Sequence, residues 1–159
     1  MNNGHNGNNG KMAKALEMST EFIDSIRKWQ ELEASAIANA RDIISKTTNP
    51  LIKMTMELIA HDSEKHRLVQ QMIIDSLTKE APHLSSDELA KLSEGLQKHV
   101  EAEAEALRFA EKALKQGELI IPRFLLAYLV EDEKKHLNML GQLDQFKRHQ
   151  AESSAGARR

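Results

Sequence analysis

The sequence predicts an all-α protein: an antiparallel up-down-up-down four-helix bundle built from a duplicated helix pair. Three observations support this prediction. Ala, Leu, Glu and Lys dominate, whereas aromatic residues make up only 4% of the 159 residues. Apolar residues recur every three or four positions in four long stretches, which is the spacing of one helix face. The motif that ends at His66 recurs at His136, so the two halves of the chain repeat with an offset of 70 positions.

Charge and composition exclude several classes of protein. A formal net charge of −2 gives no general attraction for nucleic acid or for a membrane surface. The absence of cysteine excludes disulfides, thiol catalysis and iron–sulfur clusters. No apolar run approaches the roughly 18 residues of a membrane span, and no secretory signal is visible. We therefore expect a cytoplasmic protein with no nucleic-acid or membrane partner.

The first helix is expected to begin near Ser19 or Thr20, because either side chain can cap a helix N-terminus. Its apolar pattern continues to about Lys46. Residues 1–18 begin with an Asn/Gly-rich run and are expected to be disordered or frayed.

The second and third helices have clear start signals. Asn49 precedes a proline, which is the order expected at a helix N-terminus, and predicts a helix over about residues 50–80. Ser85 and Glu88 have the spacing of a capping box and predict a helix over about residues 86–116.

Gly117 is a candidate C-terminal cap for the third helix, and the fourth helix is predicted over about residues 120–149. Residues 151–159 are expected to form a disordered tail. The bundle domain itself is expected to span residues 19–150. The three connections are short, which favours antiparallel neighbours.

The apolar stripes of these helices contain carboxylate and imidazole side chains. Glu133 and His136 are one turn apart on one helix face. Glu33, His66 and Glu103 occupy the corresponding stripes of the other three helices. Burying such groups without a partner would cost several kcal/mol, and a metal ion is the leading candidate to neutralise them. Equal spacings in the two helix pairs predict that all five side chains meet near the middle of the bundle.

These motifs resemble the ferritin-like superfamily, in particular the rubrerythrin- and bacterioferritin-type di-iron carboxylate proteins. That family has one glutamate on each of two helices and a Glu-x-x-His on each of the other two. Glu33 and Glu103 look like the single glutamates, and Glu133-Lys-Lys-His136 looks like one complete Glu-x-x-His. The resemblance covers about residues 20–149. The metal ligands that it implies are Glu33, His66, Glu103, Glu133 and His136.

The sequence departs from the family at Ser63, where the second Glu-x-x-His would have its glutamate. Three carboxylates leave an excess positive charge on two divalent ions. Asp62 is a candidate substitute ligand, and the alternative for Asp62 is a hydrogen bond to a histidine or a backbone N–H. The site would then hold one metal, hold two weakly or be vestigial. We expect His61 and His99 to support the ligands or lie at the surface, and Trp29 to lie in the core.

The resemblance implies iron as the metal, in a di-iron or single-iron centre, with manganese and zinc as alternatives. The implied activity is oxidation of ferrous iron by dioxygen or peroxide, or reduction of peroxide, with an unidentified electron donor. No catalytic residue is assigned, and a homodimer is compatible with the pattern. The alternative function is a metal-free helical bundle that dimerises or binds a partner. In that case His66 and His136 would neutralise the carboxylates, or the carboxylates would be protonated.

Overall fold

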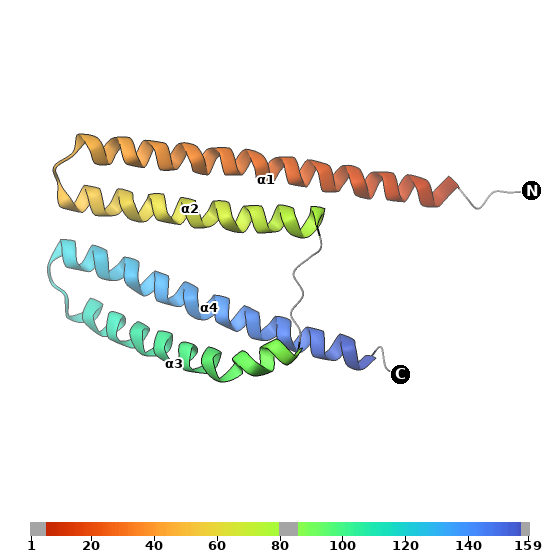
Figure 1. The fold of residues 1–159 in the computed structure, drawn as a ribbon. Coiled ribbons are helices and arrows are strands. Elements are labelled where there is room, and N and C mark those ends of the chain that lie inside the picture. The colour runs from red at the N-terminus through yellow and green to blue at the C-terminus, as the bar shows by residue number, and fades with distance from the viewer. Residues whose placement is uncertain (1–5, 80–85, 157–159) are drawn as a thin grey trace, which may run out of the picture. The chain divides into compact units, whose positions relative to one another are not determined.

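The computed structural model describes the backbone of residues 6–79 and 86–156 and confirms that the protein is all-α. Four helices account for nearly all of these residues, and no strand occurs in the described ranges. The helices are α1 (Asn6–Lys46), α2 (Pro50–Thr78), α3 (Ser86–Gln116) and α4 (Ile120–Gly156), as Figure 1 shows.

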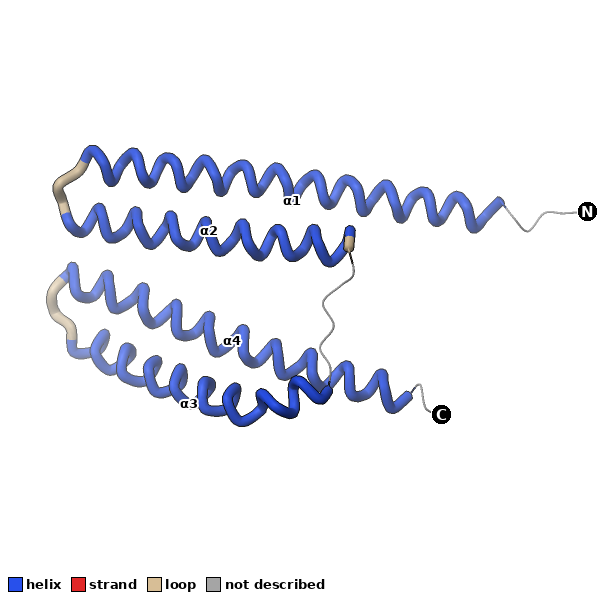
Figure 2. The backbone as a smooth tube through the Cα atoms, in the orientation of Figure 1, coloured by secondary structure: helices blue, strands red, loops and turns tan. Residues whose placement is uncertain are grey.

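The chain divides into two compact units, residues 1–82 and residues 83–159. Each unit contains one helical hairpin, α1 with α2 and α3 with α4, and a short loop joins the two helices of each hairpin (Figure 2). The prediction of a single bundle domain over residues 19–150 concerns how the hairpins pack on one another, and it stays a prediction.

Side-chain contacts show that α1 and α2 run in opposite directions. The Gln30 amide donates to the Gln71 side chain and to the Arg67 carbonyl, each at 3.3 Å. Further along α1, Arg41 pairs with Glu64, which lies earlier on α2, at 2.8 Å. Later residues of α1 therefore meet earlier residues of α2, as expected for helices joined by a tight turn.

The predicted N-cap of α2 is confirmed. The Asn49 side-chain oxygen accepts hydrogen bonds from the backbone N–H groups of Leu51, at 2.9 Å, and Ile52, at 3.3 Å. Pro50 occupies the first helical position. Asn49 therefore satisfies two N–H groups that no residue of the helix can satisfy.

The connection between α3 and α4 is closed by an arginine. The Arg123 guanidinium donates to the carbonyls of Leu114, at 3.2 Å, and Gly117, at 3.0 Å. Gly117 directly follows α3, as expected for a C-terminal cap, but no described glycine has a positive φ. The terminal carbonyls are therefore satisfied by a side chain from α4 rather than by a left-handed glycine.

The expected start of α1 is wrong. The helix begins at Asn6, so the expected N-caps Ser19 and Thr20 lie inside it. The run Lys11–Met18 contains several strong helix formers, and their propensity continues the helix through positions that could have capped it.

The expected end of α4, near residue 149, is also too early, because the helix continues to Gly156. Gln150, Ala151 and Glu152 favour helix, and no proline interrupts them. The predicted capping box at Ser85 falls outside the described residues, as do residues 1–5 and 157–159.

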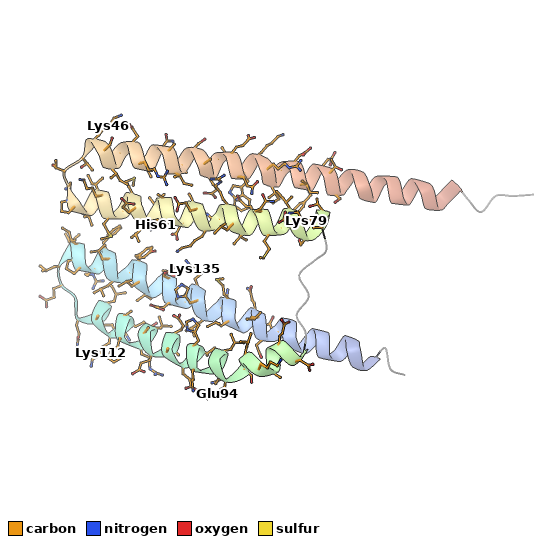
Figure 3. The ribbon with its side chains drawn as sticks, viewed as in Figure 1. Lys46, His61, Lys79, Glu94, Lys112 and Lys135 are labelled. Carbon is orange, nitrogen blue, oxygen red and sulfur yellow. The ribbon has the colours of Figure 1, made fainter. Side chains whose placement is uncertain are left out.

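The interior of the first hairpin is apolar except at three positions. Its buried apolar side chains are Ile26, Ile37, Ala40, Ala60 and Ile74. Glu33, Ser63 and Gln70 are buried among them. Charged side chains such as Glu94 and Lys112 lie on the side of α3 away from α4, as Figure 3 shows for the second hairpin. None of the described helices has a stretch that is apolar and long enough to cross a bilayer.

Each hairpin also has exposed residues at positions that match across the offset of 70, and these residues are here called its open side. Four such residues in the first hairpin have exposed counterparts in the second. The two sets are Phe22, Trp29, Ile59 and Val69, and Leu92, His99, Leu129 and Met139. Seven of these eight residues are large and apolar.

Candidate metal centre

Glu103 on α3 and Glu133 with His136 on α4 form a group that could hold a metal ion. One ligand atom from each residue lies within 4.8 Å of the others. His136 Nδ1 is 3.2 Å from Glu103 Oε2 and 3.6 Å from Glu133 Oε2. Glu133 and His136 reach the same point because they are one helical turn apart, and Glu103 faces them from the other helix of the hairpin.

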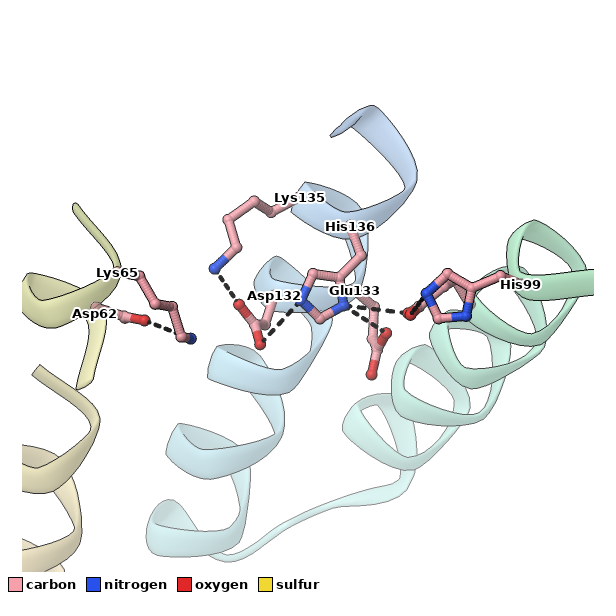
Figure 4. Close-up of polar contacts among 8 residues, drawn as sticks. Asp62, Lys65, His99, Asp132, Glu133, Lys135 and His136 are labelled. Carbon is pink, nitrogen blue, oxygen red and sulfur yellow. Dashed lines mark hydrogen bonds and ion pairs between the residues drawn. The ribbon is translucent and has the colours of Figure 1, made fainter. Parts of the chain in front are cut away.

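Asp132 lies on the side of the His136 ring that faces away from the two glutamates. Figure 4 shows one ring nitrogen facing Asp132 and the other facing the glutamate carboxylates. His136 Nε2 is 3.7 Å from Asp132 Oδ2, and Asp132 itself pairs with Lys135. A carboxylate beside the second ring nitrogen of a histidine is the usual partner of a metal-binding imidazole, and Asp132 occupies that position.

The two glutamates of this group have opposite pKa shifts. A hydrogen bond with Glu133 lowers the pKa of Glu103, and His136 lowers it further. The same hydrogen bond, together with burial and the Glu103 charge, raises the pKa of Glu133. Two adjacent carboxyl groups do not both ionise easily, so the proton of Glu133 is harder to remove than that of an ordinary glutamate. A cation at this point would oppose that effect by attracting both carboxylates.

One atom of the group lacks a partner. Glu133 Oε2 is buried and accepts no hydrogen bond from any described residue. A buried acceptor without a donor is costly, so the oxygen needs a ligand to offset its lost hydration. A metal ion beside His136 Nδ1 would supply one.

His99 extends the group on the outer side of Glu103. His99 Nε2 lies 3.2 Å from Glu103 Oε1, and the His99 side chain is 60% exposed. An open cavity of about 220 Å³ is lined by His99, Glu103, His136, Met139 and Leu140. The sequence signal for this contact is the four-residue spacing of His99 and Glu103, which puts them one turn apart on α3.

The first hairpin builds a different environment around Glu33. The carboxylate is 9% exposed, accepts a 3.0 Å hydrogen bond from Trp29 Nε1 and lies 3.1 Å from His66 Nδ1. The Ser63 hydroxyl is the largest of several causes that lower the pKa of Glu33, and His66 and Trp29 add to it against the effect of burial. Glu33 is therefore stabilised as an anion by neighbouring donors. Trp29 was expected in the core but is half-exposed.

Ser63 and Asp62, at the position where the sequence departs from the family pattern, make contacts within the first hairpin. Ser63 is buried and donates to Glu33, so the hydroxyl acts as a hydrogen-bond partner of the remaining carboxylate. Asp62 pairs with Lys65 at 3.0 Å, and no group of three ligands in the described part of the chain includes Asp62. Glu33 and His66 lie in one unit, and the other three predicted ligands lie in the second. The meeting of all five stays a prediction.

The contacts of the two hairpins recur with the offset found in the sequence. The glutamate–histidine contact, the contact with the residue four positions before the glutamate, and an aspartate–lysine pair all occur twice. These pairs are Glu33–His66 and Glu103–His136, Trp29–Glu33 and His99–Glu103, and Asp62–Lys65 and Asp132–Lys135. The hairpins differ at one position of the group, because Ser63 in the first hairpin corresponds to Glu133 in the second. Only the second hairpin therefore has two glutamates at these positions.

No protein-family model, curated protein or solved structure matches this chain. The resemblance to ferritin-like proteins therefore rests on the residues and contacts described above. Together they define a four-helix, all-α protein with a glutamate–histidine group suited to a metal ion.

Proposed function

We propose that this chain is a metal-binding protein of the ferritin-like type, whose α3–α4 hairpin holds a divalent transition metal ion. Glu103, Glu133 and His136 are the ligands. The observation that carries the proposal is the buried, unpartnered Glu133 Oε2 beside a second carboxylate and an imidazole. Two carboxylates and one imidazole suit iron, manganese and zinc.

The distances within the group fit a metal ion. Metal–ligand bonds of about 2.1 Å at tetrahedral angles place neighbouring ligand atoms about 3.4 Å apart. The two measured distances from His136 Nδ1, 3.2 Å to Glu103 and 3.6 Å to Glu133, bracket that value. Two carboxylates also balance the charge of one divalent ion, so the site needs no further anion.

We propose iron as the physiological metal, and oxidation by dioxygen or peroxide, or reduction of peroxide, as the reaction. Bound iron would supply the one-electron chemistry. His136 supplies a nitrogen that Asp132 orients, and the two glutamates supply the negative charge. Three protein ligands leave positions open for a small oxidant. Electrons for repeated turnover would come from a separate donor.

We further propose that the two open sides face each other, which would complete an antiparallel four-helix bundle from a duplicated hairpin. The matched exposed residues of the two hairpins support this arrangement, because removing large apolar side chains from water lowers the free energy of the protein. Glu33 and His66 would then approach the Glu103 group and offer a second, weaker metal site. Ser63 leaves that second site one carboxylate short.

Metal analysis of protein purified without an affinity tag tests the proposed ligands. After anaerobic loading with ferrous iron and desalting, we expect one tightly bound ion per wild-type chain. His136→Ala should lose this ion, whereas His61→Ala, a change at an exposed histidine outside the group, should keep it. Equal iron content in the His136→Ala protein and the wild type would rule out the proposed ligand set.

The reaction is tested on the same iron-loaded protein. We expect rapid oxidation on mixing with dioxygen or hydrogen peroxide, followed by absorbance, and much slower oxidation in Glu133→Gln. Ferrous ion that is bound but oxidised no faster than in buffer would leave a metal site without the proposed activity.

A second candidate function is supported by the open sides. A metal-free protein could use these apolar surfaces to bind a second copy or a helix of another protein. His136, or a proton on Glu133, whose pKa is raised, would then offset the charge of the pair without a metal. Chains that stay metal-free after ferrous loading but associate in ultracentrifugation would favour this function.

A further inference from the structure

We propose that His99 is a positioning residue for the metal ligand Glu103, a role that rests on the proposed metal site. The two oxygens of the Glu103 carboxylate face different imidazoles. His99 Nε2 lies 3.2 Å from Oε1, and His136 Nδ1 lies 3.2 Å from Oε2. His99 thus faces the outer oxygen, and Oε2 faces the point where Glu133 and His136 meet.

The first hairpin shows what this position can do without binding a metal. Trp29 lies four residues before Glu33, as His99 lies four residues before Glu103. Its indole nitrogen donates to Glu33 Oε1 at 3.0 Å. An indole N–H can donate a hydrogen bond but cannot act as a ligand of a metal ion. A ring nitrogen within 3.2 Å of the glutamate, from the residue one turn before it, is therefore a shared feature of both hairpins. We infer that its shared role is to position the carboxylate.

The side chain one turn before the glutamate has a different place in each hairpin. In the first hairpin, Trp29 and His66 both contact Oε1 of Glu33. In the second, His99 and His136 contact different oxygens of Glu103. His99 lies outside the group of three whose ligand atoms are mutually within 4.8 Å. His99 therefore acts on the group through Glu103. Removing such an outer partner of a ligand typically lowers metal affinity by about 10–100-fold.

Substitution of His99 by the residue of the other hairpin separates positioning from ligation. His99→Phe removes the ring nitrogen that faces Glu103 and keeps an aromatic ring, and His99→Trp supplies an N–H donor that cannot ligate a metal. With Co²⁺ as the probe, we expect His99→Phe to bind about 10–100-fold more weakly than the wild type. His99→Trp should bind with an affinity close to that of the wild type and give the same visible absorption spectrum, because the ligands of the cobalt are unchanged.

Two outcomes would overturn the inference. Wild-type affinity in His99→Phe would mean that the contact does not position Glu103. Weak binding with an altered cobalt spectrum in His99→Trp would mean that His99 is itself a ligand. Circular dichroism of each variant controls for loss of helix.

A metal-free measurement keeps this inference separate from the proposed function. If the wild type bound no cobalt, the proposed site would fail, but the contact could still be measured. Unfolding of His99→Phe, Glu103→Gln and the double variant gives the coupling between the two side chains. A coupling of zero would contradict the positioning role on its own, whereas His136→Ala tests only the metal site.

Discussion

At the scale of single residues, two glutamates of the chain have pKa shifts in opposite directions. Glu33 is held as an anion by a serine, a histidine and a tryptophan, and its pKa is lowered. Glu133 sits beside a second carboxyl group, and its pKa is raised. The two glutamates have different neighbours: Ser63 is a hydrogen-bond partner of Glu33, whereas Glu103 lies beside Glu133. Two neighbouring carboxyl groups are therefore described only in the second hairpin's group, where a cation would reduce their repulsion.

This difference predicts opposite effects of two glutamine substitutions on metal-free protein. A raised pKa at Glu133 contributes stability below the ordinary value of 4.5, and this contribution is lost as the pH rises through the raised pKa. A lowered pKa at Glu33 contributes stability above 4.5, which is lost as the pH falls through the lowered pKa. At pH 7, with a chelator present, Glu133→Gln should therefore raise the free energy of unfolding and Glu33→Gln should lower it.

Guanidinium unfolding of both variants and the wild type at pH 7 and at pH 4 measures these effects. Adding metal should stabilise the wild type and leave Glu133→Gln unchanged, since binding to the folded state alone adds about 2.7 kcal/mol at 100 times the dissociation constant. Destabilisation of metal-free Glu133→Gln at pH 7 would argue against a raised pKa of Glu133 beside Glu103.

Much of the candidate site can be read from the sequence, because it depends on helical periodicity. The spacing of Glu133 and His136 is enough to predict that they share one face of α4. The matching position of Glu103 predicts that it faces them from α3. His99 was expected to support a ligand or lie at the surface, and it does both, but the contact of Trp29 was not predicted, because Trp29 was expected in the core. The role of Ser63 as a donor likewise depends on its distance from Glu33, which spacing alone does not give.

At the scale of helices, the two hairpins close by different means. Asn49 caps the start of α2, whereas Arg123, near the start of α4, satisfies the end of α3. The Asn49 cap was predictable because an asparagine before a proline is a local signal. The start of α1 at Asn6 was not predicted, because a run of helix formers competes with the caps at Ser19 and Thr20, and local signals do not rank the two effects.

The cap gives a prediction for stability. Asn49→Ala should lower the free energy of unfolding by about 1 kcal/mol, because two N–H groups at the start of α2 lose their acceptor. Thermal unfolding followed by circular dichroism measures the loss. Thr48→Ala, which changes a neighbouring loop residue, is the matched control and should stay close to the wild type. Equal melting temperatures for Asn49→Ala and Thr48→Ala would show that the cap contributes little.

At the scale of the whole molecule, the proposed bundle makes a prediction about the exposed apolar residues of the open sides. Val69 on the open side is 58% exposed within the described structure, and its neighbour Leu68 is 73% exposed. The two side chains point in directions about 100° apart around α2. They would therefore have different surroundings if another hairpin packed on the open side, and similar ones if α1 and α2 stood alone.

Substitution by lysine at these neighbours tests closure of the bundle. We expect Val69→Lys to destabilise the protein by about 2 kcal/mol or more, because it would place a charge in a covered apolar contact. Leu68→Lys should change stability by less than about 0.5 kcal/mol, as surface substitutions usually do. Chemical denaturation gives both values. Two equally small effects would mean that the open side stays in contact with water.

The chain contains one tryptophan, and the hydrogen bond of Trp29 to Glu33 places it within the first hairpin. The proposed metal ligands belong to the second hairpin. The natural fluorophore and a coloured ion such as cobalt would therefore occupy different halves of the polypeptide without any chemical labelling. Quenching of the indole emission by energy transfer to the cobalt would then depend on the distance between Trp29 and the metal site. A titration with the metal would therefore measure that distance in solution.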